Sequence, residues 1–300
     1  DIHIVTSQAK PDPNFPTLPF PNPEEPGALD ELLALAQHVH ADLAIAHDPD
    51  ADRLAVCVRD GEQMRQLTGD ELGAILAHIL LKSGRTGTYA NSIVSGTLLG
   101  KLAHAHGQAF TQTLTGFKWI GKVDRLAFGY EEALGYCVRP DLSGDKDGIS
   151  AALLLLNAAN DMRRRARTLL DELDDLAREF GVHATRQVSI RANDMSDVRA
   201  VLAGVQENPP TELGGQQVTH IVDLSQPLHE QRPTDGMKVL LDGGCWVVFR
   251  PSGTEPKLKC YIEVVAPVRS SLVEAKRHAA EALDAIAADL STVLSRAQSQ

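Results

Sequence analysis

Strand-like and helix-like segments alternate between residues 43 and 181, and this alternation constrains the fold more than any other feature of the sequence. Short apolar runs such as 43–46 predict buried strands. Capped amphipathic segments predict helices, as where Thr68-Gly69-Asp70-Glu71 forms a capping box. Such alternation predicts βαβ units around a mostly parallel sheet. The expected strands are 43–46, 54–58, 92–94, 108–113 and 126–130, and the expected helices are 28–39, 69–82, 98–106, 149–165 and one capped by Thr168 that stops at Gly181.

The rhythm changes after Gly181. Strand-like runs separated by turns follow there, together with two helical segments, and this order predicts an α+β module with an antiparallel sheet. We place boundaries near residues 85 and 182, which divide the chain into 1–85, 86–181 and 182–300. The expected strands are 188–190, 221–222, 238–241, 246–249 and 258–265, and the expected helices lie near 197–205 and 272–290.

Three local signals concern the first part of the chain. Asn22-Pro23-Glu24-Glu25 predicts a helix start, with an N-cap followed by Pro and Glu. Asp60-Gly61 predicts a hairpin turn. The Pro-rich stretch 11–26 predicts an ordered connector with Phe15 and Phe20 as anchors, because flexible linkers seldom carry such large apolar residues.

Composition narrows the functional classes. The 300 residues are 43% hydrophobic, enough for two or three domains. The net charge of −11, with Arg163–Arg167 as the one basic cluster, argues against a nucleic-acid partner. There is no signal peptide and no apolar run near the roughly 18 residues that span a membrane. Four scattered cysteines indicate reduced thiols in the cytoplasm. A start at Asp1, without Met, predicts a fragment or a processed chain.

The acidic run Asp48-Pro49-Asp50-Ala51-Asp52-Arg53 lies between two predicted strands. Alternating carboxylates on a tight loop can converge on one hard cation, so Asp48, Asp50 and Asp52 predict a Mg²⁺ site. Arg53 can neutralise surplus negative charge or hold a phosphate in bidentate fashion.

This acidic run has three alternative interpretations. An EF-hand needs Gly at loop position six and Glu at position twelve, where this chain has Arg53 and Arg59. A haloacid-dehalogenase-type phosphatase would have Thr or Val four residues after its nucleophilic Asp, whereas Asp52 follows Asp48. A solvated acidic turn is the remaining alternative.

A second loop, Arg250-Pro251-Ser252-Gly253-Thr254-Glu255-Pro256-Lys257, also lies between strands. Gly253 lets the backbone approach an anion, Ser252 and Thr254 add hydroxyls, and Arg250 adds a charged fork. These residue types favour phosphate binding over a plain hairpin turn.

Three further segments carry candidate substrate contacts. In Thr115-Gly116-Phe117-Lys118-Trp119-Ile120-Gly121, a loop could stack a sugar face on Trp119 and meet a phosphate with Lys118, or the aromatics could be packing anchors. In Gly129–Gly135, Glu131 could accept hydrogen bonds from sugar hydroxyls, or form an exposed acidic turn. In Asp145–Gly148, Lys146 could donate a proton, or the segment could cap a helix.

Together the loops DPDADR, TGFKWIG, YEEALG, GDKDG and RPSGTEPK, in this order, resemble the α-D-phosphohexomutase superfamily of phosphoglucomutases and phosphomannomutases. They look closest to its phosphoglucomutase-2-like and phosphopentomutase branch. The resemblance implies mixed-sheet, three-layer α/β domains followed by a smaller α+β domain. On that pattern 1–85 is the end of domain two with the metal loop, 86–181 is the sugar-binding domain three, and 182–300 is the phosphate-binding lid.

The resemblance also implies roles for individual residues. It implies Mg²⁺ as cofactor on the three aspartates, a catalytic acid or base at Lys146, and a sugar 1,6-bisphosphate as intermediate and activator. Arg53 would assist catalysis beside the metal. Substrate contacts would come from Gly116, Lys118, Trp119, Glu131, Arg250, Ser252, Gly253 and Thr254.

Two departures from the family pattern matter. Ala133 stands where many relatives have Ser or Thr, which removes one sugar contact. The family's phosphorylated serine lies in a Ser-His-Asn loop of an N-terminal domain, and no such segment occurs in these 300 residues. We therefore expect this chain alone to be inactive. The alternatives are a phosphosugar-binding protein without chemistry and a sugar-bisphosphate synthase of the same superfamily.

Overall fold

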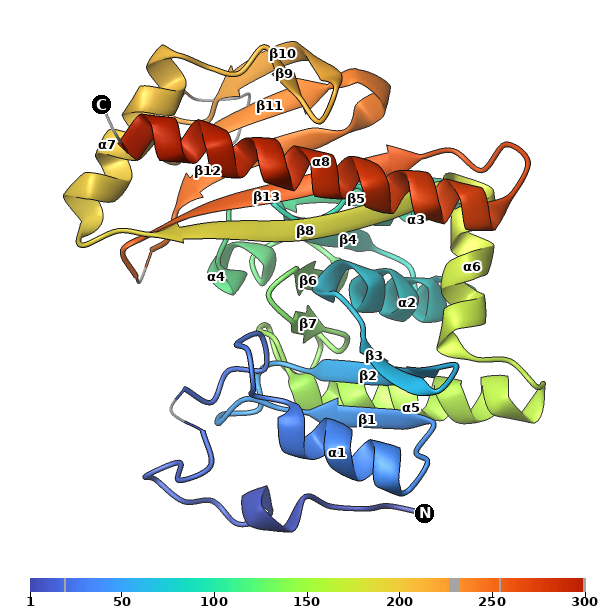
Figure 1. Ribbon diagram of the computed structural model, residues 1–300. Coiled ribbons are helices and arrows are strands. Elements are labelled where there is room, and N and C mark those ends of the chain that lie inside the picture. The colour runs from blue at the N-terminus through green and yellow to red at the C-terminus, as the bar shows by residue number, and fades with distance from the viewer. Residues whose placement is uncertain (19, 227–232, 254, 299–300) are drawn as a thin grey trace. The chain divides into compact units, whose positions relative to one another are not determined.

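The computed structural model describes residues 1–18, 20–226, 233–253 and 255–298. They form two compact units, Asp1–Leu173 and Asp174–Gln300 (Figure 1). Each unit has its own sheets and its own buried apolar cluster.

The first sheet of unit 1 is antiparallel and has the order β1-β2-β3. The hairpin predicted at Asp60-Gly61 is confirmed, because Asp60 pairs with Gln63 and Gly61 has φ +59°. The acidic loop connects β1 to β2. The elements are α1 (Asp30–His38), β1 (Leu43–Ala46), β2 (Ala55–Asp60) and β3 (Gln63–Gln66), with α1 packed against β1 and β3.

The helix start predicted at residues 22–25 is wrong. Asn22 Oδ1 accepts a hydrogen bond from Glu24 N at 3.0 Å, and Asn22 O accepts one from Glu25 N at 2.9 Å, so Asn22 closes a turn. Gly27, at φ +84°, separates this turn from α1, which begins at Asp30. Asn caps tight turns as readily as helices, and the residue types alone do not distinguish the two.

The second sheet of unit 1 has the order β5-β4-β6-β7. Strand β4 runs parallel to β5 and β6, whereas β7 is antiparallel to β6. The predicted parallel arrangement therefore applies to this sheet and not to the first one. The strands are β4 (Thr88–Ser92), β5 (Ala109–Thr113), β6 (Leu126–Glu131) and β7 (Gly135–Cys137), and the helices are α2 (Gly69–Lys82), α3 (Leu98–Ala105), α4 (Phe117–Ile120) and α5 (Gly148–Arg164).

The capping box predicted at the start of α2 is confirmed. Thr68 Oγ1 accepts from Glu71 N at 3.1 Å, and Glu71 Oε2 accepts from Thr68 N at 2.9 Å. Helix α2 packs against β6 and α3, and α5 packs against β7. Buried aromatic rings fill the centre of this layer, with centroids 6.0–6.4 Å apart along the series Tyr89, Phe128, Tyr130 and Tyr136.

Unit 2 contains an antiparallel sheet with the strand order β8-β13-β12-β11-β10-β9, as predicted for this part of the chain. Alternate strand residues such as Val247, Phe249 and Ile262 pack with residues of α7 and α8 in one core. The elements are α6 (Leu169–Phe180), which crosses the boundary between the units, β8 (Val182–Arg191), α7 (Met195–Glu207), β9 (Glu212–Leu213), β10 (Gln216–Asp223), β11 (Met237–Leu241), β12 (Trp246–Pro251), β13 (Lys257–Ala266) and α8 (Leu272–Gln298).

The Pro-rich N-terminal segment does not bury its two phenylalanines. Phe15 is 41% exposed and Phe20 is 58% exposed, so the prediction that they anchor the segment is wrong. Phe15 also has φ +45°, an uncommon conformation for a residue other than Gly.

Candidate active site

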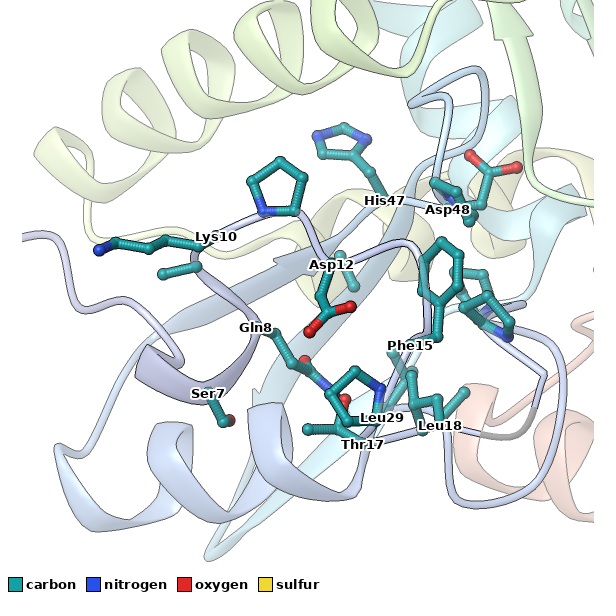
Figure 2. A pocket seen from close by; sticks show the side chains of 18 of the residues that line it. Ser7, Gln8, Lys10, Asp12, Phe15, Thr17, Leu18, Leu29, His47 and Asp48 are labelled. Atoms are coloured by element: carbon teal, nitrogen blue, oxygen red, sulfur yellow. The ribbon is translucent and has the colours of Figure 1, made fainter.

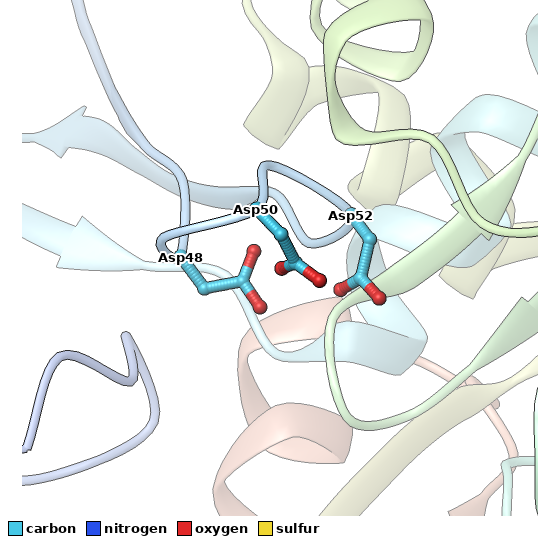
Figure 3. A group of neighbouring side chains, drawn as sticks. All are labelled: Asp48, Asp50 and Asp52. Carbon is cyan, nitrogen blue, oxygen red and sulfur yellow. The ribbon is translucent and has the colours of Figure 1, made fainter.

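Three aspartates of the loop between β1 and β2 point toward one another (Figure 3). Asp48, Asp50 and Asp52 each offer a carboxylate oxygen, and these oxygens lie within 4.8 Å of one another. Three like charges at this spacing repel unless a cation or protons neutralise them. The structure therefore brings the three predicted ligands together in one loop.

The residues present fit a hard divalent cation. Asp52 Oδ1 is buried and accepts no hydrogen bond from the described residues. Burial raises the pKa of Asp48, the hydrogen bond from Arg53 N lowers it, and the charges of Asp52 and Asp50 raise it again. A cation between the carboxylates would give Asp52 Oδ1 a partner and favour the charged form of Asp48. Oxygen ligands of this kind suit Mg²⁺.

A tight turn explains why alternating side chains of this loop converge. Ala51 N donates to Asp48 O at 3.0 Å, with Ala51 in the left-handed region at φ +56°. Arg53 N donates to Asp48 Oδ1 at 3.0 Å. Helix α5 begins against this turn, because Gly148 N donates to Ala51 O at 3.0 Å. A Cβ on Gly148 would lie 2.3 Å from Arg53 O, so this contact requires glycine.

Arg53 is surrounded by carboxylates. Its Nη1 lies 2.9 Å from Glu24 Oε2, and its Nε lies 3.5 Å from Asp48 Oδ2 and 3.9 Å from Asp52 Oδ1. These contacts support the reading in which Arg53 neutralises the acidic loop. His47 also holds the backbone of this loop, because its Nδ1 lies 2.7 Å from Arg53 O.

Lys146 reaches the same loop from the chain segment before α5. Its ammonium forms an ion pair with Asp52 Oδ2. Gly135 makes room for it, because a Cβ there would lie 2.6 Å from Lys146 Cδ. The neighbouring Asp147 caps α5, with Oδ1 accepting from Ile149 N at 3.0 Å. The segment thus caps a helix and also places Lys146 beside Asp52.

Glu131 and Gly116 come together although 15 residues separate them. Glu131 lies at the end of β6, and its Oε1 accepts a hydrogen bond from Gly116 N at 2.5 Å. Gly116 has φ +105°, a conformation that favours glycine, and it precedes α4. The carboxylate of Glu131 therefore fixes the start of the segment that carries Lys118 and Trp119.

The predicted TGFKWIG loop contains one turn of helix, α4. Phe117 and Ile120 are buried and hold the turn against β6, whereas Lys118 is exposed and Trp119 is partly exposed. Lys118 Nζ lies 5.6 Å from the centroid of the Trp119 ring, within the range of a cation–π contact. Two residues of this segment are thus packing anchors, and two face outward as the sugar-binding reading requires.

Sequence reasoning missed a polar layer behind Glu131. Glu132 forms hydrogen bonds with the hydroxyls of Ser92 and Ser95, and Asp70 accepts hydrogen bonds from Gly96 N and the Tyr130 hydroxyl. These residues come from α2, β4 and β6 and from the turns after β4 and β6. The one sequence signal was the paired Glu131-Glu132, which does not show which carboxylate points inward.

The predicted phosphate loop of unit 2 joins β12 to β13. Ser252 is 6% exposed, and its N donates to Lys257 O at 2.8 Å. An added Cβ on Gly253 would meet no described atom within 4 Å, so the backbone there is accessible. Arg250 lies on β12 opposite Lys259 of β13. Thr254, also predicted to bind phosphate, lies outside the described residues.

A cavity of about 490 Å³ lies between the Pro-rich segment and the start of the acidic loop (Figure 2). Its wall combines proline and phenylalanine faces with the charged groups of Lys10 and Asp12. His47 and Asp48 also line it, so the cavity adjoins the aspartate cluster.

Among the described residues, no helix combines the length and apolar character needed to cross a membrane.

Known proteins match the chain along most of its length. The α/β/α domain II of phosphoglucomutase/phosphomannomutase matches residues 1–61, the α/β/α domain III matches residues 68–178, and the C-terminal domain matches residues 190–270. The "Probable phosphomannomutase" of Haemophilus influenzae is 43% identical over 264 residues, 87% of this chain and 54% of that protein. The phosphoglucomutase of Staphylococcus aureus strain USA300 is 32% identical over 291 residues, 89% of this chain and 52% of that protein.

A solved structure shares the fold. The open form of pp63/parafusin, a phosphoglucomutase from Paramecium, gives a TM-score of 0.65 at 21% identity, over 91% of this chain and 50% of that one. The chain therefore belongs to the α-D-phosphohexomutase superfamily, and the predicted family and fold class are confirmed. It spans about half the length of the curated relatives it matches. Its predicted place in the phosphoglucomutase-2-like branch and the domain boundaries stay predictions.

Proposed function

We propose that this chain forms the metal-binding and sugar-binding part of a phosphosugar mutase. The intact protein would move a phosphoryl group between C1 and C6 (or C5) of a sugar, through a phosphoserine and a sugar bisphosphate. The observation that carries the proposal is the convergence of Asp48, Asp50 and Asp52, with Lys146 on Asp52, in a chain of this superfamily. The names of the relatives support the same reaction class.

The acidic loop would hold Mg²⁺ through its three aspartates. A bound Mg²⁺ would supply positive charge to the transferring phosphoryl group. Arg53 offsets part of the negative charge of the loop, through its contacts with Asp48 and Glu24. Lys146 is our candidate to hold or deliver a proton at the reacting sugar oxygen, since its ammonium already lies beside the acidic loop.

The sugar and its second phosphate would be held at two places. In unit 1, Glu131 would accept hydrogen bonds from sugar hydroxyls, with Gly116, Lys118 and Trp119 beside it. In unit 2, the distal phosphate would bind the loop made of Arg250, Ser252, Gly253 and Thr254. Ala133 leaves one sugar contact unmade, so we propose a phosphosugar substrate without choosing among glucose, mannose and pentose phosphates.

Location and partners follow from the proposed substrate. Charged sugar phosphates do not cross an apolar bilayer, so the enzyme must share their compartment. We propose the cytoplasm, which the four free, buried thiols also favour. The proposed partners are the phosphosugar substrate, a sugar 1,6-bisphosphate activator and the serine-bearing domain typical of the family.

A coupled assay on the intact protein tests this function. Glucose 1-phosphate and mannose 1-phosphate are supplied in turn, with Mg²⁺ and catalytic sugar 1,6-bisphosphate. Arg250→Ala should lower kcat/KM about ten- to hundredfold, because a hydrogen bond to a charged group is worth about 1.5–3 kcal/mol. Glu131→Gln should lower kcat/KM while the melting temperature stays nearly constant.

Two results would overturn the proposed mutase. Saturable phosphosugar binding without turnover in the intact protein would establish the binding-protein alternative. Turnover that requires another phosphoryl donor, and accumulates the bisphosphate, would establish the synthase alternative. Unchanged kcat/KM in Arg250→Ala would remove the unit 2 loop from the site.

A further inference from the structure

Three side-chain oxygen atoms beside the loop Gly129–Gly135 form a closed triangle. Glu132 Oε2 lies 2.9 Å from Ser92 Oγ and 3.1 Å from Ser95 Oγ, and the two hydroxyls lie 2.9 Å from each other. Both serines are 0% exposed. Glu132 N also donates a hydrogen bond to Ser95 Oγ at 3.2 Å, so the backbone of the loop Gly129–Gly135 contacts this triangle directly.

The number of hydrogen-bonding protons in this triangle depends on the protonation state of Glu132. Three hydrogen bonds require three protons, and the two serine hydroxyls supply two. If Glu132 is ionised, one edge of the triangle has two acceptors facing each other without a proton. If Glu132 carries a proton on Oε2, each oxygen donates once and accepts once, and the ring closes. The geometry therefore favours the neutral form of Glu132.

The electrostatic surroundings favour the same form. Asp70, from the first turn of α2, and Glu131, next along β6, place negative charges nearby, and the phenols of Tyr130 and Tyr136 lie in the same layer. Burial raises the pKa of Glu132 to about 7, with Glu131 and Asp70 raising it further and the hydrogen bond from Ser92 lowering it.

Asp70 is placed to keep its charge while Glu132 gives its charge up. Its Oδ1 accepts from Gly96 N at 2.6 Å and from the Tyr130 hydroxyl at 2.8 Å, and it stands where a helix N-terminus favours an anion. Glu132 has only serine hydroxyls at Oε2. Hydrogen bonds from a backbone amide and a phenol thus stabilise the charged form of Asp70, whereas burial favours the neutral form of Glu132.

We propose that Glu132 is a protonated positioning residue that holds the end of β6, and with it Glu131, in place for the sugar. The inference rests on the proposed function, since Glu131 is the sugar contact there. Glu132 is the first residue of the turn after β6, and its carboxylate meets the buried hydroxyls of Ser92 and Ser95, whereas the carboxylate of Glu131 meets Gly116 N. Loss of the proton opens the triangle, puts a third negative charge in the layer and displaces the Glu131–Gly116 contact.

The test uses the 300-residue chain labelled with ¹⁵N-glycine. The amide proton of Gly116, which donates to Glu131 Oε1, is followed by NMR as the pH rises. We expect its chemical shift to titrate with a midpoint near 7 and to be constant over that range in Glu132→Gln. A midpoint that persists in Glu132→Gln, or no titration in the wild type, would overturn the proposal.

Asp70→Asn is the second variant, and it keeps the test valid should Glu132→Gln fail to fold. It removes one negative charge and keeps an acceptor for Gly96 N, so the midpoint should fall by at least about half a pH unit. An unchanged midpoint counts against the proposal.

The intact protein adds a kinetic readout. Its kcat/KM should fall above about pH 7 in the wild type, and Glu132→Gln should lose this dependence. Absence of mutase activity would reject the proposed function, whereas the titration of Gly116 tests Glu132 separately.

Discussion

The two carboxylate oxygens of Asp52 differ in their surroundings. Its Oδ2 pairs with the ammonium of Lys146, while its buried Oδ1 lacks a hydrogen bond among the described residues. A metal ion bound as we propose would share this carboxylate with Lys146. The contact depends on Gly135, where any side chain would displace Lys146.

Lys146→Met should therefore tighten Mg²⁺ binding by the chain. The Lys146 side chain is 21% exposed and that of Asp52 is 27% exposed, so solvent screens their attraction. Partly screened pairs are worth about 0.5–1 kcal/mol, which corresponds to roughly two- to fivefold in affinity. Calorimetric titration with MgCl₂ at fixed ionic strength measures this change.

Lys101→Met is the control, since it removes the same charge from α3. It should leave the Mg²⁺ affinity unchanged. Weaker binding in Lys146→Met would mean that Lys146 holds the loop in shape instead of competing for Asp52.

Two nearby glycines make a matched pair for testing the contact between α5 and the acidic loop. Gly148→Ala places a Cβ 2.3 Å from Arg53 O, whereas Gly144→Ala meets no described atom within 4 Å. We expect Gly148→Ala to lower the free energy of unfolding by about 1–3 kcal/mol, and Gly144→Ala to change it by less than about 0.5 kcal/mol. Urea unfolding compares them, and equal effects would show that the loop can move away from α5.

At the scale of elements, one buried carboxylate of α6 contacts two residues of α2. Glu172 is 4% exposed, and its Oε1 lies 2.8 Å from both His78 Nδ1 and Lys82 Nζ. The close contact with His78, and then the hydrogen bond from Lys82, lower the pKa of Glu172 from 4.5 to about 2 against the effect of burial.

The lowered pKa fixes the sign of a pH dependence. Glu172 stabilises the fold fully above its unfolded pKa of 4.5, and this contribution disappears as the pH falls through about 2. Glu172→Gln should lose about 1–2 kcal/mol at pH 7, because the Lys82 side chain is 57% exposed and its share is screened.

Urea unfolding at pH 7 and near pH 3 measures the Glu172 contribution, with the exposed Glu179→Gln of the same helix as control. The difference between Glu172→Gln and wild type should shrink at the lower pH. A difference that stays constant with pH would show that Glu172 acts by packing and not by charge.

Most regular elements could be predicted because their signals are local. The capping box at Thr68 and the hairpin at Asp60-Gly61 depend on residues a few positions apart. Strand β7 could not be predicted, because its three residues are a strand only through pairing with β6. The antiparallel pairing of β1 with β2 was missed for a related reason, since hydrophobic pattern indicates a strand without indicating its partner's direction.

The candidate site divides in the same way. The three aspartates were predictable because one loop carries them. Glu132 and Asp70 were not, because α2 and β6 bring together residues some 60 positions apart, as in the bond from Tyr130 to Asp70. Which of the two adjacent glutamates meets buried partners depends on the path of the turn after β6, and that path is set by contacts with residues distant in sequence such as Ser92 and Ser95.

At the scale of the whole molecule, the chain carries the acidic loop and the loops proposed to bind the sugar and its distal phosphate, and its 300 residues contain no Ser-His-Asn segment. The proposed reaction needs a serine that stores the phosphoryl group. We therefore expect no turnover by this chain alone with glucose 1-phosphate, Mg²⁺ and catalytic glucose 1,6-bisphosphate. Turnover that Asp50→Asn abolishes and a mock preparation lacks would reveal another nucleophile.

The central claim is that Asp48, Asp50 and Asp52 form the metal centre of a phosphosugar mutase. Crystals of the chain grown with Mn²⁺, a hard cation with similar ligand preferences to Mg²⁺, allow a direct measurement by anomalous scattering. The account predicts an anomalous peak bound by all three carboxylates, with Asp52 Oδ1 as one ligand. Mn²⁺ elsewhere in the crystal, with this loop empty and Asp52 still paired with Lys146, would contradict it.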